Sequence, residues 1–142
     1  MRHSVFDTTV VAYSNGDLAG RRRGNVLDRR ICTLEEALSG HTVPRYNKKL
    51  LKEYENHLVT HRNDVITAFL VLLADKGVFV PKSTLPRQVY ARAQSIRWPT
   101  HDQHLLAAAI DEEGTRILVT ETALANCARA AKREFGVVVI EL

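Results

Sequence analysis

The sequence contains only two cysteines among its 142 residues. Cys32 and Cys127 each stand alone in a stretch with helical patterning, so neither the paired spacing of a zinc site nor a disulfide framework is present. Disulfides belong mainly to proteins of oxidising compartments. The scarcity of cysteine therefore favours a protein of the reducing cytoplasm.

Long apolar runs are also lacking. The longest, Val65 to Ala74, is interrupted by Thr67 and is much shorter than the roughly 20 residues that a transmembrane helix needs. The first residues, MRHSVFD, show no apolar core of the kind that defines a signal peptide. We expect a cytoplasmic protein that has no membrane partner.

A glycine-rich phosphate-binding motif is missing as well, which argues against the common nucleotide-binding classes. The composition that remains, 45% hydrophobic and 25% charged residues, is ordinary for a soluble globular protein. The length predicts a single domain over residues 1–142. The formal net charge of +4 is a weak indication of a polyanionic partner, because Lys and Arg neutralise phosphates.

The spacing of apolar residues predicts strands and helices in alternation along the chain. We expect strands at 5–6, 41–43, 116–119 and 137–140, a short strand or extended connection at 78–80, and helices at 25–38, 48–61, 63–74, 86–96, 101–110 and 123–135. Alternation of this kind is typical of the α/β class. It predicts a mainly parallel sheet that helices cover on both faces.

Two acidic residues follow predicted strands and stand among hydroxyl side chains. Asp7 lies in the corner Asp7-Thr8-Thr9, after Val5 and Phe6, and Glu121 lies in the corner Thr120-Glu121-Thr122, after the strand 116–119. An acid in such a place can simply cap the next helix. It can also hold a ligand, because ligands of parallel sheets bind beyond the carboxyl ends of the strands.

Two further acids are associated with predicted helices. Asp102 falls in the first turn of a helix for which Thr100 is the expected N-cap, a position that the helix dipole favours for any acid. Glu53 lies beside the apolar stripe of the helix 48–61, whereas Glu55 lies on the opposite face. A carboxylate beside a buried face is costly unless it is paired or binds a metal, so Glu53 is the more informative of the two.

Taken together, Asp7, Glu53, Asp102 and Glu121 suggest a carboxylate cluster at one edge of a parallel sheet. Carboxylates brought together repel each other, and a divalent cation relieves that repulsion. Oxygen ligands favour Mg²⁺ or Mn²⁺ over zinc. A cation site of this kind suits the hydrolysis of phosphodiester bonds.

Four segments in order, VFDTT, LLKEYENHL, HDQHLLAAAI and ILVTETAL followed by VVVIEL, resemble the successive motifs of PIN-domain ribonucleases. The resemblance spans nearly the whole chain. It implies a three-layer α/β/α sandwich and an endoribonuclease that depends on Mg²⁺ or Mn²⁺. It also implies a possible homodimer, and the toxin half of a toxin–antitoxin pair, as in VapC, whose partner would be an antitoxin protein.

By position, the resemblance assigns Asp7, Glu53 and Asp102 as the central metal-binding and catalytic acids. The sequence departs from the family at two places. Thr9 stands where the family often has Asn, and the late motif has Glu121 and Thr122 in place of an Asp. Glu121 or Thr122 would then assist the metal, and Thr8 and Thr120 would support the site.

Three consecutive arginines, Arg21, Arg22 and Arg23, stand between glycines and form either a loop that grips RNA phosphates or a solvated turn. Arg92 and Arg97 are further candidates for backbone contacts. Several other residues have two interpretations, of which packing or solvation is preferred. These are the helically spaced pairs His57/His61 and His101/His104, as zinc ligands, and Trp98, as a platform for a base.

Two alternative functions remain open at this level. A PIN-like fold with an altered late motif would also suit a catalytically weak or inactive module that binds RNA or protein. The segments 34–40 and 48–58 could instead form a DNA-binding helix-turn-helix, although the HTVPRYN segment between them is longer than the usual turn.

Overall fold

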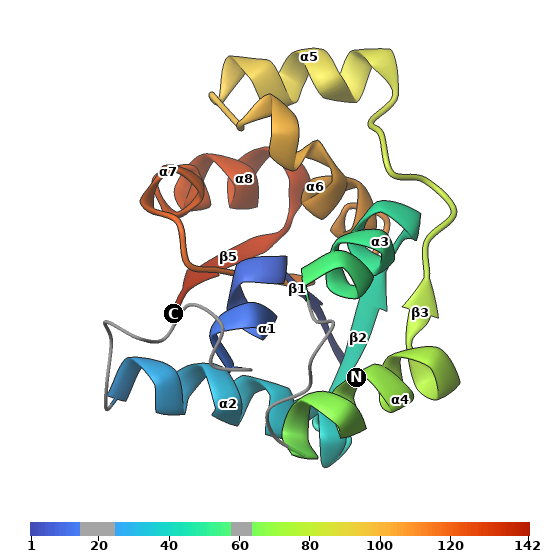
Figure 1. Ribbon diagram of the computed structural model, residues 1–142. Helices are drawn as coiled ribbons and strands as arrows, with labels where there is room; N and C mark the ends of the chain where they lie inside the picture. The colour runs from blue at the N-terminus through green and yellow to red at the C-terminus, as the bar shows by residue number, and fades with distance from the viewer. Residues whose placement is uncertain (15–24, 58–63) are drawn as a thin grey trace.

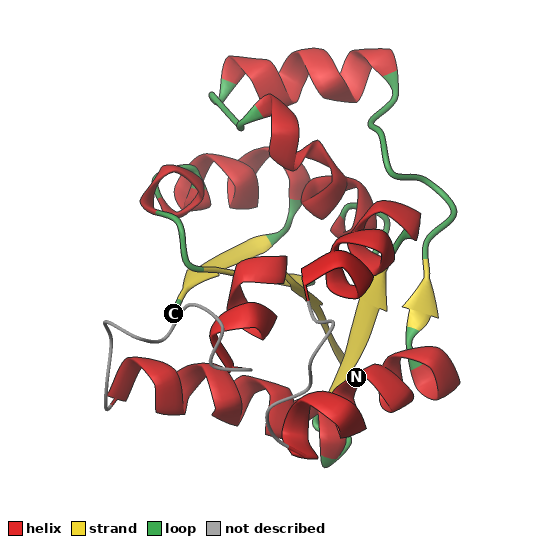
Figure 2. Cartoon of the chain, viewed as in Figure 1, coloured by secondary structure: helices red, strands yellow, loops and turns green. Residues whose placement is uncertain are grey.

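A computed structural model describes residues 1–14, 25–57 and 64–142. Its centre is a five-stranded sheet in the order β3-β2-β1-β4-β5, in which every paired neighbour is parallel. Figure 1 shows the path of the chain, and Figure 2 shows the strands enclosed by helices. The α/β class with a parallel sheet is therefore confirmed.

The elements alternate along the described chain as the apolar spacing predicts. The strands are β1 (Arg2–Phe6), β2 (Thr42–Tyr46), β3 (Val78–Phe79), β4 (Arg116–Val119) and β5 (Val138–Glu141). The helices are α1 (Thr8–Ser14), α2 (Asn25–Leu38), α3 (Lys48–His57), α4 (Asp64–Lys76), α5 (Arg87–Ser95), the 3₁₀ turn η2 (Thr100–Asp102), α6 (Gln103–Ala109), α7 (Thr122–Ala125) and α8 (Ala128–Phe135).

Helices form a layer on each side of the sheet. On one side α1, α2 and α4 pack against one another and against the strands, and on the other side α6 covers the middle strands while α7 and α8 cover β5 (Figure 1). The core between the layers is apolar and closed to solvent, with Phe6, Leu105 and Leu118 fully or almost fully buried. This arrangement agrees with a three-layer α/β/α sandwich.

The strand order reverses between β1 and β4. From β1 the chain adds β2 and then β3 on one side, and it then returns across the sheet to place β4 and β5 on the other. In open α/β sheets such a switch point leaves a crevice at the carboxyl ends of the two strands, where ligands bind. Asp7 follows β1, and Thr120 follows β4, so both lie at this crevice.

Several predicted element boundaries differ from the structure by a few residues, and two of the differences have a clear physical cause. The strand expected to stop at Pro44 continues to Tyr46, because β3 pairs with β2 only from Arg45 onward and leaves no partner on that side at Pro44. The single helix expected over 123–135 is divided into α7 and α8. The division falls at Asn126 and Cys127, two weak helix formers, where the Cys127 thiol also lies 3.5 Å from the Ile96 carbonyl oxygen.

The helix-turn-helix alternative is wrong. The two segments proposed for it belong to α2 and α3, and strand β2 separates these helices in the middle of the structure. The two helices are therefore not connected by the short turn that, in a helix-turn-helix, places the recognition helix in a DNA groove. No helix among the described residues has the length and apolar character needed to cross a membrane.

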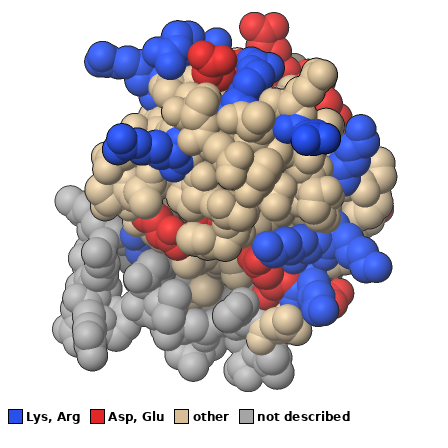
Figure 3. All heavy atoms as spheres, turned by 90° about the horizontal axis from the view of Figure 1, so that it is seen from above, with Lys and Arg blue, Asp and Glu red and all other residues tan. Residues whose placement is uncertain are grey.

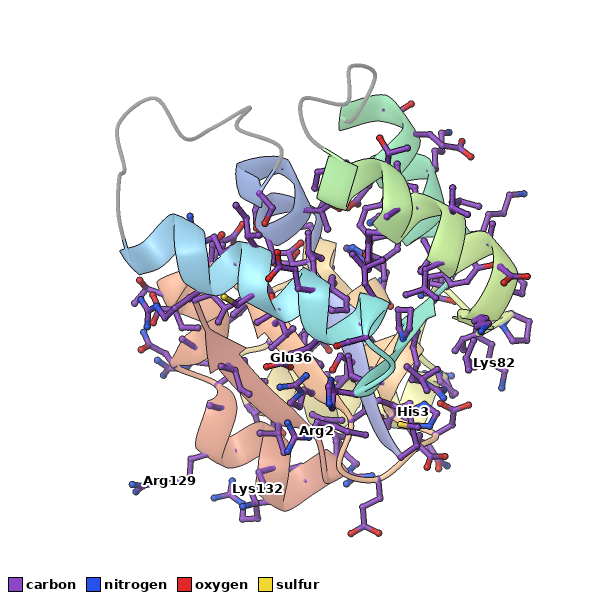
Figure 4. All side chains as sticks on the ribbon, turned by 90° about the horizontal axis from the view of Figure 1, so that it is seen from below. Arg2, His3, Glu36, Lys82, Arg129 and Lys132 are labelled. Carbon is purple, nitrogen blue, oxygen red and sulfur yellow. The ribbon has the colours of Figure 1, made fainter. Side chains whose placement is uncertain are left out.

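Polar side chains fix the amino ends of the strands, away from the switch point. The Ser4 and Thr42 hydroxyls are 2.8 Å apart, and Arg116 donates to the Ser4 hydroxyl at 3.0 Å. Arg116 also forms an ion pair of 3.0 Å with Glu36 of α2, which is labelled in the view from below (Figure 4). These contacts hold β1, β2 and β4 in register at one end and leave the other end for the candidate site.

Asn47, which is fully buried, joins three segments near the carboxyl end of β2. Its Oδ1 accepts the Leu50 backbone N–H at 3.1 Å, as expected for the N-cap of α3, and its Nδ2 donates to the His104 carbonyl at 2.9 Å and the Lys82 carbonyl at 3.2 Å. Asn47 therefore holds α3 against α6 and fixes the two helices that carry site residues.

We predict that Asn47→Ala lowers the free energy of unfolding by about 2–4 kcal/mol, because it removes a helix cap and leaves buried carbonyls without a donor. Urea denaturation followed by circular dichroism measures the change. Asn126→Ala, at an exposed position after α7, is the matched control and should change stability by less than about 0.5 kcal/mol. Equal effects of the two substitutions would contradict this account of Asn47.

Candidate active site

A cleft of about 320 Å³ opens at the switch point of the sheet, and α1, α3 and α6 pack around it. Its lining residues are Asp7, Thr8, Thr9, Ala12, Glu53, Asp102 and Glu121. All four acids predicted from the sequence therefore meet in one cleft, although they are separated by up to 114 positions (7 to 121). Their convergence is a property of the fold that no single motif contains.

Asp7 lies at the bottom of the cleft, where β1 passes into α1. Its backbone N–H donates to the Leu118 carbonyl at 3.0 Å, which extends the pairing of β1 with β4, and its carboxylate accepts the Thr9 hydroxyl at 3.1 Å. The side chain is buried. Burial, reinforced by the negative charges of Asp102 and Glu121, raises the pKa of Asp7 to about 6.

Glu53 approaches the cleft from α3. Its carboxylate accepts the Thr8 hydroxyl at 2.7 Å, and Nε2 of the buried His104 lies 3.4 Å from Oε1. Partial burial raises the pKa of this carboxyl, but the contact with His104, the hydrogen bond from Thr8 and the nearby positive charge of Lys49 outweigh burial and leave the pKa below its ordinary value. Glu55, by contrast, is exposed, as the helical spacing predicts.

Asp102 ends the 3₁₀ turn η2, immediately before α6. The predicted N-cap role of Thr100 is wrong: Pro99 precedes η2, Asp102 itself occupies the N-cap position of α6, and neither makes a side-chain capping bond. Buried Trp98 donates its indole N–H to the Asp102 carbonyl at 2.9 Å. Trp98 therefore packs in the core and fixes Asp102, and it is not available to stack on a base.

The carboxyl group of Asp102 lacks ordinary partners. Its Oδ2 atom is buried and accepts no hydrogen bond from the described residues, while Nε2 of exposed His101 lies 3.2 Å away. Burial raises the pKa of Asp102, the neighbouring His101 opposes that rise, and the negative charge of Glu121 adds to it. A buried carboxylate oxygen that accepts no hydrogen bond is costly, so this atom is suited to a positively charged ligand.

The corner Thr120-Glu121-Thr122 follows β4 and contributes to the cleft. Glu121 lines the cleft and occupies the N-cap position of α7 without making a capping hydrogen bond. The Thr120 hydroxyl donates to the Thr9 hydroxyl at 2.8 Å, which joins the two acidic-hydroxyl corners directly. Thr122 begins α7 and is exposed, so the supporting contact comes from Thr120.

Sequence reasoning missed three contributors to the cleft. Thr9 binds both Asp7 and Thr120, a role that the sequence does not predict. His104 is buried, which agrees with the preferred packing interpretation, but its contact with Glu53 is not predicted. Lys49 donates to the His101 carbonyl at 3.3 Å, and its positive charge lowers the pKa of Glu53. The apolar residues after His104 were a usable signal, because they place it on the buried face of its helix.

Several other residues proposed from the sequence either bind elsewhere in the structure or fall outside the described residues. Arg92 is engaged on α5, where it hydrogen-bonds Glu134 and lies 4.9 Å from the Phe135 ring centroid. Arg21, Arg22, Arg23 and His61 lie outside the described residues, so the predicted RNA-gripping loop and the His57/His61 pair have no structural outcome.

The donor set suits a hard divalent cation. Carboxylates supply the oxygen ligands that Mg²⁺ and Mn²⁺ prefer, and a cation would relieve both the repulsion around Asp7 and the unsatisfied oxygen of Asp102. Comparisons with protein-family models, curated proteins and solved structures give no match for this chain. Membership of the PIN family is therefore a hypothesis that rests on the ordered motifs.

We predict that Asp7→Asn stabilises the metal-free protein at pH 7. The pKa of Asp7 is about 6 in the folded protein and about 3.8 in an unfolded chain, so the carboxyl is neutral in both states well below pH 4. Its ionisation costs folding free energy as the pH rises to about 6. The variant should match the wild type at pH 3.5 and exceed it by up to about 3 kcal/mol at pH 7.

Urea denaturation in the presence of a chelator, repeated across this pH range, measures the difference. Asp75→Asn on the exposed side of α4 is the control and should leave the pH dependence unchanged. A variant that is less stable than the wild type at pH 7 would show that the Asp7 carboxylate is compensated in the metal-free protein.

Proposed function

We propose that this protein is a metal-dependent endoribonuclease that hydrolyses RNA phosphodiester bonds. The observation that carries the proposal is the convergence of Asp7, Glu53, Asp102 and Glu121 in one cleft at the switch point of a parallel sheet. Such a position binds ligands in many α/β proteins, and a group of carboxylates there is chemically suited to a cation. The ordered resemblance to PIN-domain ribonucleases supports the same reaction.

Asp7, Glu53 and Asp102 would hold Mg²⁺ or Mn²⁺, with Glu121 assisting directly or through water. Bound there, the cation would supply Lewis-acid activation of water and neutralise charge on the phosphate. Thr8, Thr9 and Thr120 orient the carboxylates through the hydrogen bonds described above. In-line attack by water would leave a 5′-phosphate and a 3′-hydroxyl, as the family resemblance implies.

Positive charge around the cleft would contact the RNA backbone. The Lys49 amino group donates to the carbonyl of His101, the residue before Asp102, and from there it would contact a phosphate bound at the cleft. Around the face that carries α5, Lys and Arg side chains are scattered among uncharged atoms and do not form one continuous patch (Figure 3). Recognition would therefore depend on a few contacts close to the cleft, with Arg21, Arg22 and Arg23 as further candidates.

A role as a toxin is proposed only on the basis of the resemblance to PIN-domain ribonucleases. A VapC-type toxin acts as a homodimer and is inhibited by an antitoxin, and both partners are proposed here for this chain. Inhibition of growth on expression of the wild type, abolished by Asp7→Asn, would support a toxin role. A wild-type protein that cleaves RNA without affecting growth would instead assign the same chemistry to RNA processing.

We predict that Mn²⁺ raises the melting temperature of the wild type and has no such effect on Asp7→Asn. A ligand at 100 times its Kd stabilises the folded state by about 2.7 kcal/mol, which corresponds to several degrees for a domain of this size. Differential scanning fluorimetry measures the shift. Asp75→Asn should retain the full shift, and Glu53→Gln should lose most of it while Glu55→Gln on the exposed face retains it.

We also predict that Mn²⁺-dependent cleavage of a fluorogenic single-stranded RNA falls by at least about 100-fold in Asp7→Asn. Because the variant is purified in the same way, residual activity reports contaminating ribonucleases. Cleavage that persists with a chelator and leaves a cyclic phosphate would refute a metal-dependent mechanism. Salt-sensitive RNA binding without a melting shift would favour a non-catalytic binding module.

A further inference from the structure

We propose that His101, Asp102 and Glu121 form a mixed imidazole–carboxylate subsite that selects a first-row transition-metal dication, such as Mn²⁺ or Co²⁺, over Mg²⁺. The inference rests on the proposed function, because it names the class of cation that the cleft takes. It assigns a ligand role to His101, which neither the carboxylate cluster nor the motif resemblance includes.

The geometry of the three side chains carries the proposal. One ligand atom from each of His101, Asp102 and Glu121 lies within 4.8 Å of the other two. His101 Nε2 and Asp102 Oδ2 are 3.2 Å apart. Neighbouring ligands of an octahedral or tetrahedral cation bound at about 2.0–2.1 Å lie about 3.0–3.4 Å apart, so this pair already has the required spacing.

An independent observation points to a ligand at the same place. Asp102 is 6% exposed, it lines the cleft, and its buried Oδ2 has no hydrogen-bond partner among the described residues. The same oxygen is the one that faces His101 Nε2. A cation between the two atoms would bind the oxygen and the lone pair of the imidazole nitrogen together.

The local backbone holds both residues in place. The Asp102 N–H donates to the Pro99 carbonyl at 3.0 Å, and the Trp98 indole donates to the Asp102 carbonyl at 2.9 Å. The His101 carbonyl accepts Lys49 Nζ at 3.3 Å. The backbone of the short turn η2 is thus anchored on two sides.

The presence of an imidazole determines which cation is preferred. Mg²⁺ binds carboxylates and waters and takes nitrogen ligands poorly, whereas Mn²⁺, Co²⁺ and later first-row ions accept imidazole with affinity that rises along the series. A site of carboxylates alone would not distinguish Mg²⁺ from Mn²⁺ strongly. Addition of His101 therefore shifts the preference toward Co²⁺ and Mn²⁺.

The test compares Mg²⁺, Mn²⁺ and Co²⁺ on wild type, His101→Gln and the control His41→Gln. His41 is exposed at the opposite end of the strands, where its side chain hydrogen-bonds Ser39. Competition titrations followed by melting temperature give the Kd values, and the visible absorption of bound Co²⁺ reports a nitrogen ligand directly. These readouts do not depend on RNA cleavage.

We expect the wild type to bind Co²⁺ and Mn²⁺ at least about tenfold more tightly than Mg²⁺. His101→Gln should weaken Co²⁺ binding by at least about tenfold, change the Co²⁺ spectrum, and alter the Mg²⁺ Kd by less than about threefold. His41→Gln should behave as the wild type. Loss of Mg²⁺ and Co²⁺ binding in equal measure would overturn the selectivity, because it would indicate a general disturbance of the cleft.

The outcomes separate this inference from the proposed function. Binding of all three cations with similar Kd and an unchanged Co²⁺ spectrum in His101→Gln would overturn the role of His101 and leave a carboxylate metal site intact. No shift by any cation in the wild type would instead overturn the proposed function itself, and the inference with it.

Discussion

The parallel pairing of β1 with β4 is the constraint on which the candidate site depends. Three residue pairs align these strands, and the bond from the Asp7 N–H to the Leu118 carbonyl extends the alignment by one further residue. Because the strands are parallel, their carboxyl ends meet at one edge, and the corners that follow them must face each other. The hydrogen bond between Thr9 and Thr120 is the direct result.

Burial of charge at this edge opposes folding, and the same burial makes the site useful. The pKa of Asp7 is raised because its carboxylate is removed from water near Asp102 and Glu121, so the metal-free protein gives up stability at neutral pH. Glu53 differs, since Thr8 and His104 compensate its charge and lower its pKa. The cleft therefore contains one compensated acid beside others that remain short of positive charge, which is the electrostatic state that a cation corrects.

The periodicity of apolar residues predicted most of the fold. The positions of four acids after strands, at a helix start and beside an apolar stripe singled out the acids that line the cleft. Both predictions depend on local patterns. The helix 25–38 and the strand 116–119 agree with α2 and β4 residue for residue. The continuation of β2 beyond Pro44 and the division of the last helix into α7 and α8 were not predicted, because contacts with neighbouring segments override local propensity at both places. The roles of Thr9 and His104 were missed for a related reason: each acts through a residue distant in sequence, and one sequence contains no record of such contacts.

The positions of the site residues derive from the core more than from surface loops. Asn47 and Trp98 are buried, and each donates to the carbonyl of a residue at the cleft, His104 and Asp102 respectively. Since a catalytic group must be held within a fraction of an ångström, fixing the backbone from the protein interior is an effective way to achieve it. Stability and cation affinity should then change together when these two core residues are altered, whereas changes at His101 should affect affinity alone, because its exposed imidazole contributes little to packing.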